Sequence, residues 1–365
     1  MSVNKISSAQ RQDSKIRVLT SIALIGAIIP TTLFGGYFFL FLIIFLCFFG
    51  TKEILEVPGK TKYTPVTKVV VFLFVFSFIF WTIIKASLIN EEVFSRASIA
   101  LSEMSVSLLA IMLYFFILFF IAIVDKRVQL IDVTFLFTSG LILALGFQSM
   151  LYLRLFPNSA GLEFLSNTKV STSFGETTYG NYFKDYYASV VGSKGQDLAS
   201  SVLLGFTFIG VWMSDVGAYF TGMLFGKHRM NPRISPHKTW EGFFGGIIVS
   251  VIFSLSAAAI MEFAFKLPLI PGLVQFSYSP LLAKMHVFGG YSFINIILLA
   301  LLMPTVGALG GLAFSLIKRT YGIKDFGKIF PGHGGVIDRF DSVLFSSIAM
   351  SILIQFSANG WSFLV

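Results

Sequence analysis

Polar residues with metal-binding and phosphate-binding chemistry gather between Ser315 and Asp341, in a sequence that is otherwise strongly apolar. The segment holds three carboxylates, five cations, one histidine and the Gly-rich turn 331–335. Asp338 and Asp341 are three residues apart, so on a helix they would share one face. Mg²⁺ takes one or two carboxylates and keeps its other positions for water and phosphate oxygens. The spacing therefore predicts a metal site, which Asp325 could complete by folding back across the turn.

The glycines of this turn have a use of their own. Gly332, Gly334 and Gly335 carry no Cβ, so their backbone can adopt unusual angles and approach a ligand closely. Backbone N–H groups of this kind, together with Lys and Arg side chains, suit the binding of phosphate. We therefore expect the turn to contact phosphate groups.

A second polar cluster begins inside an apolar run. Asp215 lies between Val202 and Phe225, where a carboxylate costs roughly 2.5–3.5 kcal/mol on membrane-insertion scales. Such a residue is a functional candidate by default, although a helix–helix hydrogen bond or a structural ion pair is the alternative. The following segment, 235–242, adds further groups that could bind a ligand.

The sequence lacks the residue patterns of several other kinds of site, namely zinc sites, disulfide frameworks, serine-hydrolase elbows and P-loops. The four histidines lack the spacing of a zinc site, and the single cysteine, Cys47, lies inside an apolar run and excludes an internal disulfide framework. The sequence has neither a Gly-x-Ser-x-Gly elbow nor a Walker A motif.

Composition indicates the kind of element that must position these residues. The sequence is 55% hydrophobic and only 12% charged, against about 25% charged in soluble domains. Since a helix crosses the bilayer with about 20 mainly apolar residues, we predict an all-α polytopic membrane protein. About nine transmembrane helices are expected, near 18–34, 37–50, 69–88, 101–124, 131–152, 201–224, 242–264, 292–317 and 342–357. The second run is short, and Gly35-Gly36 could join it to the first as a tight helical hairpin.

Charge distribution predicts the orientation of these helices. With the N-terminus in the cytoplasm, most of the 27 Lys and Arg residues fall in cytoplasmic segments, as expected for inner loops. This explains the net charge of +9 without a nucleic-acid partner. We expect the first apolar run to be an anchor and not a removable signal peptide.

The expected organisation has four parts: a cytoplasmic segment (1–17), N-terminal transmembrane helices (18–152), an extracytoplasmic loop (153–200) and a C-terminal transmembrane catalytic region (201–365). The loop holds an aromatic stretch at 179–187. A lid or partner surface is one interpretation of it, but an interfacial aromatic belt is favoured.

The polar residues also resemble a known family. Segment 315–341 is similar throughout to the signature of phosphatidate cytidylyltransferases, the CDP-diacylglycerol synthases, and is closest to bacterial members. The signature positions here are Ser315, Ile317, Lys318, Arg319, Lys324, Asp325, Gly327, Pro331, His333, Gly334, Gly335, Val336, Asp338, Arg339, Phe340 and Asp341. Segment 215–246 is similar to the family's second block, except that His237 stands where a lysine is common.

The resemblance implies transfer of CMP from CTP to phosphatidate, with CDP-diacylglycerol and pyrophosphate as products. It implies Mg²⁺, with a second monovalent or divalent cation as an option, and an active site facing the cytoplasm from the inner membrane. The implied catalytic residues are Lys324, Asp325, Asp338, Arg339 and Asp341, and the implied metal ligands are Asp215, Asp325, Asp338 and Asp341. Substrate binding would fall to Ser235, Lys238, Ser315, Lys318, Arg319, His333, Gly334 and Gly335, although His333 could equally shape the turn.

Two alternatives remain open. A transporter would carry inverted repeats with interrupted helices in matching halves, whereas both polar blocks here fall in the second half. A CDP-alcohol phosphotransferase would carry its own Asp-Gly motif with an Ala-Arg pair, which this sequence lacks; a CTP-using lipid kinase is the related option. The partners expected are CTP, phosphatidate and membrane lipids, with a homodimer as one option for assembly.

Overall fold

Nine helices of 19 residues or more dominate the described part of the chain. The computed structural model describes residues 8–88, 106–155, 169–172, 175–178, 195–265, 286–288 and 291–358. The helices are α1 (Ser8–Phe34), α2 (Gly36–Glu56), α3 (Pro65–Leu88), α5 (Val106–Val124), α6 (Leu130–Leu155), α9 (Gly195–Phe225), α10 (Trp240–Phe265), α11 (Phe293–Thr320) and α12 (Ile337–Ala358).

Seven of these helices are long and apolar enough to cross a membrane, namely α2, α3, α5, α6, α9, α10 and α11. α1 adds a shorter apolar stretch, Leu19–Phe34, and α12 is the remaining long helix. Large apolar side chains cover the outside, such as Phe116 at 65% exposure and Ile123 at 80%, which lipid would solvate. The all-α polytopic fold is confirmed, while the count of nine spans and the N-terminal orientation stay predictions.

The junction between the first two helices lies where the glycine pair predicts it. Only Gly35 separates α1 from α2, and its φ of 63° lies in the left-handed region that favours glycine. The Arg154 guanidinium fills the space that a Cβ on Gly35 would need, and its Nε donates to the Thr32 carbonyl at 2.8 Å. The second run is longer than expected: α2 has 21 residues and continues beyond Gly50 through the buried Thr51 and Glu53 to Glu56.

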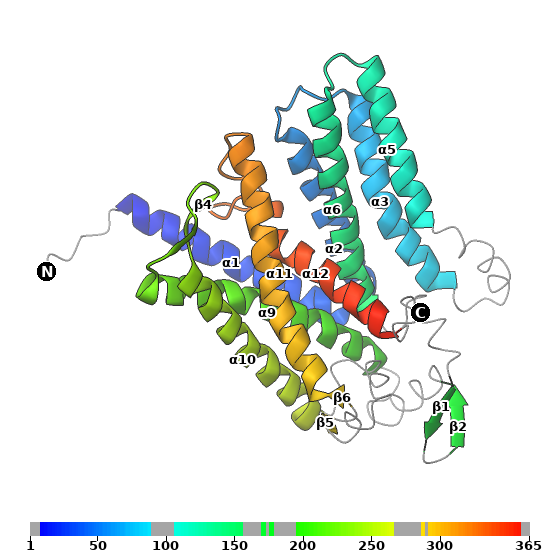
Figure 1. The fold of residues 1–365 in the computed structure, drawn as a ribbon, viewed down its shortest axis with the longest axis vertical. Helices are drawn as coiled ribbons and strands as arrows, with labels where there is room; N and C mark the ends of the chain where they lie inside the picture. Colours follow the sequence, from blue (N-terminus) through cyan, green and yellow to red (C-terminus); the bar gives the residue numbers. More distant parts are fainter. Residues whose placement is uncertain are drawn as a thin grey trace, which may run out of the picture.

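The last helix lies in the middle of the bundle. α12 packs against α11, α6 and α9, and Figure 1 shows it in red between α11 and α6. Its apolar residues Ile337, Val343 and Leu344 are almost fully buried. A helix in this place is surrounded by protein on several sides, which explains why its first turn can hold the buried carboxylate of Asp338.

α9 and α10 approach closely because small residues line their contact. A Cβ on Gly246 would lie 2.7 Å from the Ser214 carbonyl, and one on Gly242 would lie 2.9 Å from the Ala218 carbonyl. This contact places the turn of α9 that carries Asp215 beside the start of α10.

Three two-stranded antiparallel hairpins, which the sequence did not predict, interrupt the helical pattern. β1 pairs with β2 inside the predicted loop 153–200, whose ends 153–155 and 195–200 belong to α6 and α9 instead. The aromatic stretch 179–187 lies outside the described residues. The strands are β1 (Lys169–Thr172), β2 (Gly175–Thr178), β3 (Arg229–Asn231), β4 (Ser235–Thr239), β5 (His286–Phe288) and β6 (Tyr291–Ser292).

Candidate active site

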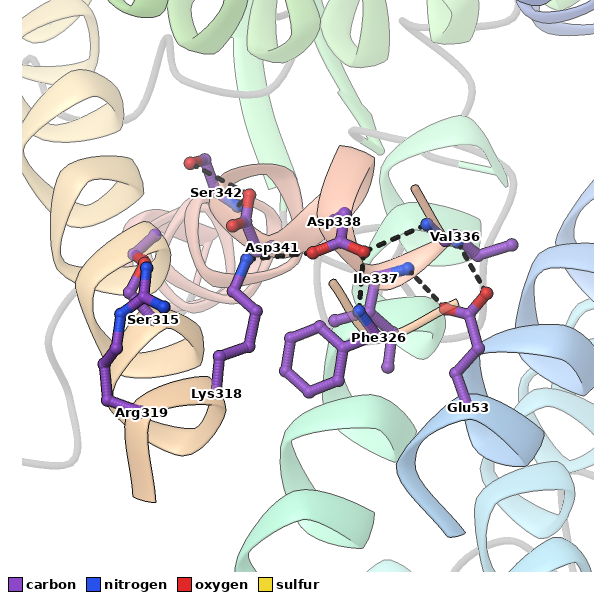
Figure 2. A network of polar contacts seen from close by, with 12 residues as sticks. Glu53, Ser315, Lys318, Arg319, Phe326, Val336, Ile337, Asp338, Asp341 and Ser342 are labelled. Atoms are coloured by element: carbon purple, nitrogen blue, oxygen red, sulfur yellow. Dashed lines mark hydrogen bonds and ion pairs between the residues drawn. The ribbon is translucent and has the colours of Figure 1, made fainter. Parts of the chain in front are cut away.

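Asp338 is the best-anchored carboxylate of the predicted site. Its Oδ1 accepts from the Lys318 Nζ at 2.8 Å, and its Oδ2 accepts from the amides of Phe326 and Gly335 at 2.8 and 2.9 Å. Only 3% of its side chain is exposed, against 13% for Lys318, whose ammonium also lies 5.4 Å from the centre of the Phe326 ring. Both oxygens are therefore used within the protein, and Figure 2 shows this network.

Asp341 lies one turn further along α12 and is less engaged. Its Oδ1 accepts from the Ser342 amide at 2.7 Å, and Oδ2 accepts no hydrogen bond from the described residues. A Cβ on Gly311 would lie 3.1 Å from the Lys238 Nζ and 4.0 Å from this Oδ2. Lys238, from β4, therefore approaches α11 and α12 next to a carboxylate oxygen that remains free.

Asp215 belongs to the same neighbourhood. It interacts electrostatically with Asp341, Lys238 and Arg339, and its carboxylate accepts no hydrogen bond from the described residues. The two polar blocks that lie far apart in the sequence thus meet in space. The Arg319 Nε also donates to the Ile234 carbonyl at 3.3 Å, which links the end of α11 to the β3–β4 hairpin.

The hairpin itself is held by residues of the second block. Glu241 accepts from the amides of Lys227 and His228, and its Oε1 lies 2.6 Å from the His228 Nδ1. The Thr239 hydroxyl accepts from the Gly242 amide at 3.1 Å and so caps the start of α10. These residues fix the position of the β3–β4 hairpin, whose strand β4 carries Lys238.

The Gly-rich turn is bound on both sides. Gly332 and Gly334 have φ of 74° and 86°, as expected for glycines in a tight turn. The Gly335 amide, which we expected to contact phosphate, donates to Asp338 in this conformation and is not free. The His333 Nε2 lies 3.0 Å from the Ser21 Oγ of α1, and its buried Nδ1 has no partner among the described residues.

Besides Ser21, two further groups outside the predicted set contribute to this turn. Glu53 of α2 accepts from the amides of Val336 and Ile337, and the Thr20 hydroxyl of α1 donates to the Pro331 carbonyl. The one available signal for Glu53 was its charge at the end of an apolar run, and that signal did not distinguish it from other acids in the loops.

The remaining predicted residues stand at the edge of the site. Lys324, Asp325 and Arg339 are exposed, and the group that reaches Asp338 from this region is the amide next to Asp325, not the Asp325 carboxylate. The Ser315 hydroxyl donates to the Gly311 carbonyl of its own helix at 2.6 Å, and Ser235 begins β4. Their roles stay predictions.

The four predicted metal ligands do not form one cluster. Within the described ranges, no three His, Cys, Asp or Glu groups lie close enough to hold a metal ion together. Asp215 and Asp341, whose oxygens keep free acceptor capacity, fit a cation that takes two carboxylates and completes its shell with water and phosphate. Asp338 fits less well, because a metal ion would have to displace Lys318.

The chain is similar in sequence to known proteins. Residues 15–357 match the Cytidylyltransferase family. Proteins named phosphatidate cytidylyltransferase are similar over 149 residues, with 38% identity in Staphylococcus epidermidis and Staphylococcus saprophyticus and 36% in Staphylococcus aureus. The matched stretch covers 41% of this chain and 47% of each relative, so the chain spans about half the length of the curated relatives it matches. Since the family match covers nearly the whole sequence, this chain belongs to the Cytidylyltransferase family.

Proposed function

We propose that this protein transfers CMP from CTP to phosphatidate, forming CDP-diacylglycerol and releasing pyrophosphate. The observation that carries the proposal is the meeting of two polar blocks where the C-terminal half of α9 approaches the end of α11 and the start of α12. There, Asp215 interacts electrostatically with Asp341, Lys238 and Arg339, and Asp341 interacts with Lys238 as well. Membership of the Cytidylyltransferase family and the names of the staphylococcal relatives support the same reaction.

The chemistry of the substrates fits a site without a nucleophile–base pair. A phosphate monoester has a second pKa near 6, so the phosphatidate oxygen is already largely ionised at pH 7. The difficulty is to bring two anions together and to stabilise the pyrophosphate that leaves. Positioning and electrostatic stabilisation dominate in phosphoryl transfer, and a site that mixes cations and carboxylates supplies both.

Asp215 and Asp341 are the residues that we assign to Mg²⁺ binding. Their carboxylates interact across the contact between α9 and α12 and keep free oxygen lone pairs. The bound ion would neutralise charge on the CTP phosphates. Whether a second cation also binds stays a prediction.

The cations divide into two groups. The first group lies near the carboxylates with a free oxygen, in the case of Lys238 and Arg339, or at the β3–β4 hairpin, in the case of Arg319. We assign these three cations to binding the phosphates of the substrates. Lys318 is held by Asp338, so we assign it to maintaining the geometry of the site.

The membrane explains where the reaction would occur. The lipid tails of phosphatidate can stay among the apolar helices while its headgroup meets CTP at the helix ends. Basic residues at these ends support a cytoplasmic site in the inner membrane of a bacterium, by the positive-inside rule. A homodimer stays a prediction.

The test is an assay with purified protein in detergent, labelled CTP, phosphatidate and Mg²⁺. We expect labelled CDP-lipid together with pyrophosphate, each dependent on phosphatidate. Folded protein that forms no CDP-lipid would refute the proposal. Labelled phosphate in the lipid without CMP would instead identify a CTP-using lipid kinase.

A matched pair of variants tests the site. Asp341→Asn should lose at least about 100-fold in turnover, the order found when one stabilising group is removed from an active site. Asp125→Asn is the control, because Asp125 also accepts a nearby backbone amide, that of Arg127, but lies outside both polar blocks. Equal activity in the two variants would contradict the assignment of Asp341.

A further inference from the structure

Glu53 is a buried carboxylate that the proposed chemistry does not use. It lies near the end of α2 with 5% exposure, in the half of the chain that lacks the signature residues. Its Oε1 accepts from the Val336 amide at 2.9 Å and its Oε2 from the Ile337 amide at 3.0 Å. Each carboxylate oxygen therefore binds one of two successive N–H groups at the start of α12.

These two amides would otherwise have no acceptor within their own helix. The first turn of a helix leaves its N–H groups unsatisfied, and its positive end favours a negative charge. Burying such groups without a partner is costly. Glu53 supplies both acceptors and the charge, across 283 residues of sequence from Val336.

Two glycines leave the space that the Glu53 carboxylate occupies. A Cβ on Gly327 or on Gly335 would overlap its carboxylate, and Gly335 does not have a positive φ that would itself require glycine. Gly335 is therefore small because Glu53 occupies the adjacent space. The opposite side of the same turn binds Asp338, as Figure 2 shows.

The turn is thus fixed between two carboxylates from different parts of the chain. Asp338 binds the amide of Gly335, and Glu53 binds the next two amides, so three successive N–H groups have defined acceptors. Asp341 follows on the same helix, one turn after Asp338. A shift of the start of α12 would move both aspartates.

We propose that Glu53 is a positioning residue by which α2 holds the Gly-rich turn and the start of α12 where the transfer reaction needs them. A carboxylate is required because it has two acceptor oxygens. A glutamine has one, and its NH₂ group would face the second amide as donor against donor. The activity part of this inference rests on the proposed function.

The first experiment compares Glu53→Gln with Glu56→Gln by steady-state kinetics. Glu56 is on the same helix, and its nearest cation, the Lys60 Nζ, is 4.0 Å away near the surface. We expect Glu53→Gln to lower kcat by about 100-fold, as misplacement by about 1 Å can do, with little change in KM for CTP. Glu56→Gln should keep both constants. Wild-type kcat per folded Glu53→Gln molecule, or a change in KM alone, would overturn the proposal.

The second experiment needs no catalysis. The thermal unfolding midpoint is measured in detergent for the wild type, Gly335→Ala, Glu53→Ala and the double variant. We expect Gly335→Ala to lower the midpoint in the wild type but much less beside Glu53→Ala, where the added Cβ has room. Additive shifts would show that the two sites do not interact and would refute the contact.

The two experiments separate the inference from the proposed function. A wild-type protein that makes no CDP-lipid defeats the function, and the unfolding measurements then decide alone whether Glu53 holds the turn. An active wild type with additive shifts defeats the inference and leaves the function standing.

Discussion

Asp338 and Asp341 lie one turn apart on α12, and exchanging each for Asn should have different consequences. Asp338→Asn keeps the shape of the side chain but removes the charge that pairs with Lys318 at 2.8 Å. Its NH₂ group also replaces one of the two oxygens that now accept hydrogen bonds. That donor would face either the Lys318 ammonium or the amides of Phe326 and Gly335, which are donors too. The variant thus leaves the largely buried Lys318 without the carboxylate that it hydrogen-bonds, although Asp341 still attracts it electrostatically.

The size of the effect follows from the burial of the pair. Removing one partner of a buried ion pair costs about 3–5 kcal/mol. We expect the lower end, about 3 kcal/mol, since 13% of the Lys318 side chain remains exposed to solvent. Asp341→Asn should change stability by less than about 1 kcal/mol, because its Oδ1 can still accept from the Ser342 amide.

The assay combines two measurements on each variant in detergent: the thermal unfolding midpoint and turnover with CTP and phosphatidate. Asp338→Asn should lower both the midpoint and the activity, whereas Asp341→Asn should lose activity at a nearly unchanged midpoint. The double variant Lys318→Met/Asp338→Asn should recover part of the stability, because the unpaired cation is gone. A stable, inactive Asp338→Asn protein would refute the anchoring role and favour direct metal binding by Asp338.

Three further predictions concern the cofactor and two structural contacts. Chelation of divalent ions should abolish CDP-lipid formation and added Mg²⁺ should restore it; activity that survives chelation would contradict metal binding at Asp215 and Asp341. Thr239→Ala should destabilise the start of α10 by about 1 kcal/mol, since the hydroxyl caps the Gly242 amide; an unchanged unfolding midpoint would argue against the cap. Gly35→Ala should lower the midpoint strongly, because φ is 63° and a Cβ would overlap the Arg154 guanidinium; the helical Gly26, where a Cβ meets nothing within 4 Å, is the matched control.

Much of the fold could be read from local pattern. Apolar runs of about 20 residues predict membrane helices wherever they occur, and the structure has a long helix at each predicted run. The glycine pair at 35–36 predicts the break between α1 and α2 for the same local reason. The hairpin β3–β4 was not predicted, because its strands have three and five residues and lack an alternating apolar pattern.

The site was predictable in part. Spacing placed Asp338 and Asp341 together, and the family resemblance joined Asp215 and Lys238 to them. The sequence could not predict which of these carboxylates keeps an oxygen without a hydrogen bond, because this depends on the donors that the folded chain places near each oxygen. Asp338 is fully used by Lys318 and two amides, whereas Asp341 keeps one oxygen available.

By itself, the sequence determined the membrane fold and the residue types from which a phosphate and metal site can be built. Both follow from hydropathy and from spacings shorter than one helical turn, which act locally. Only the tertiary structure decided that Glu53 of α2 and Ser21 of α1 contact the Gly-rich turn. These contacts join residues that are 283 and 312 positions apart, and a pairing at that separation is set by how the helices pack and not by any local preference of the chain.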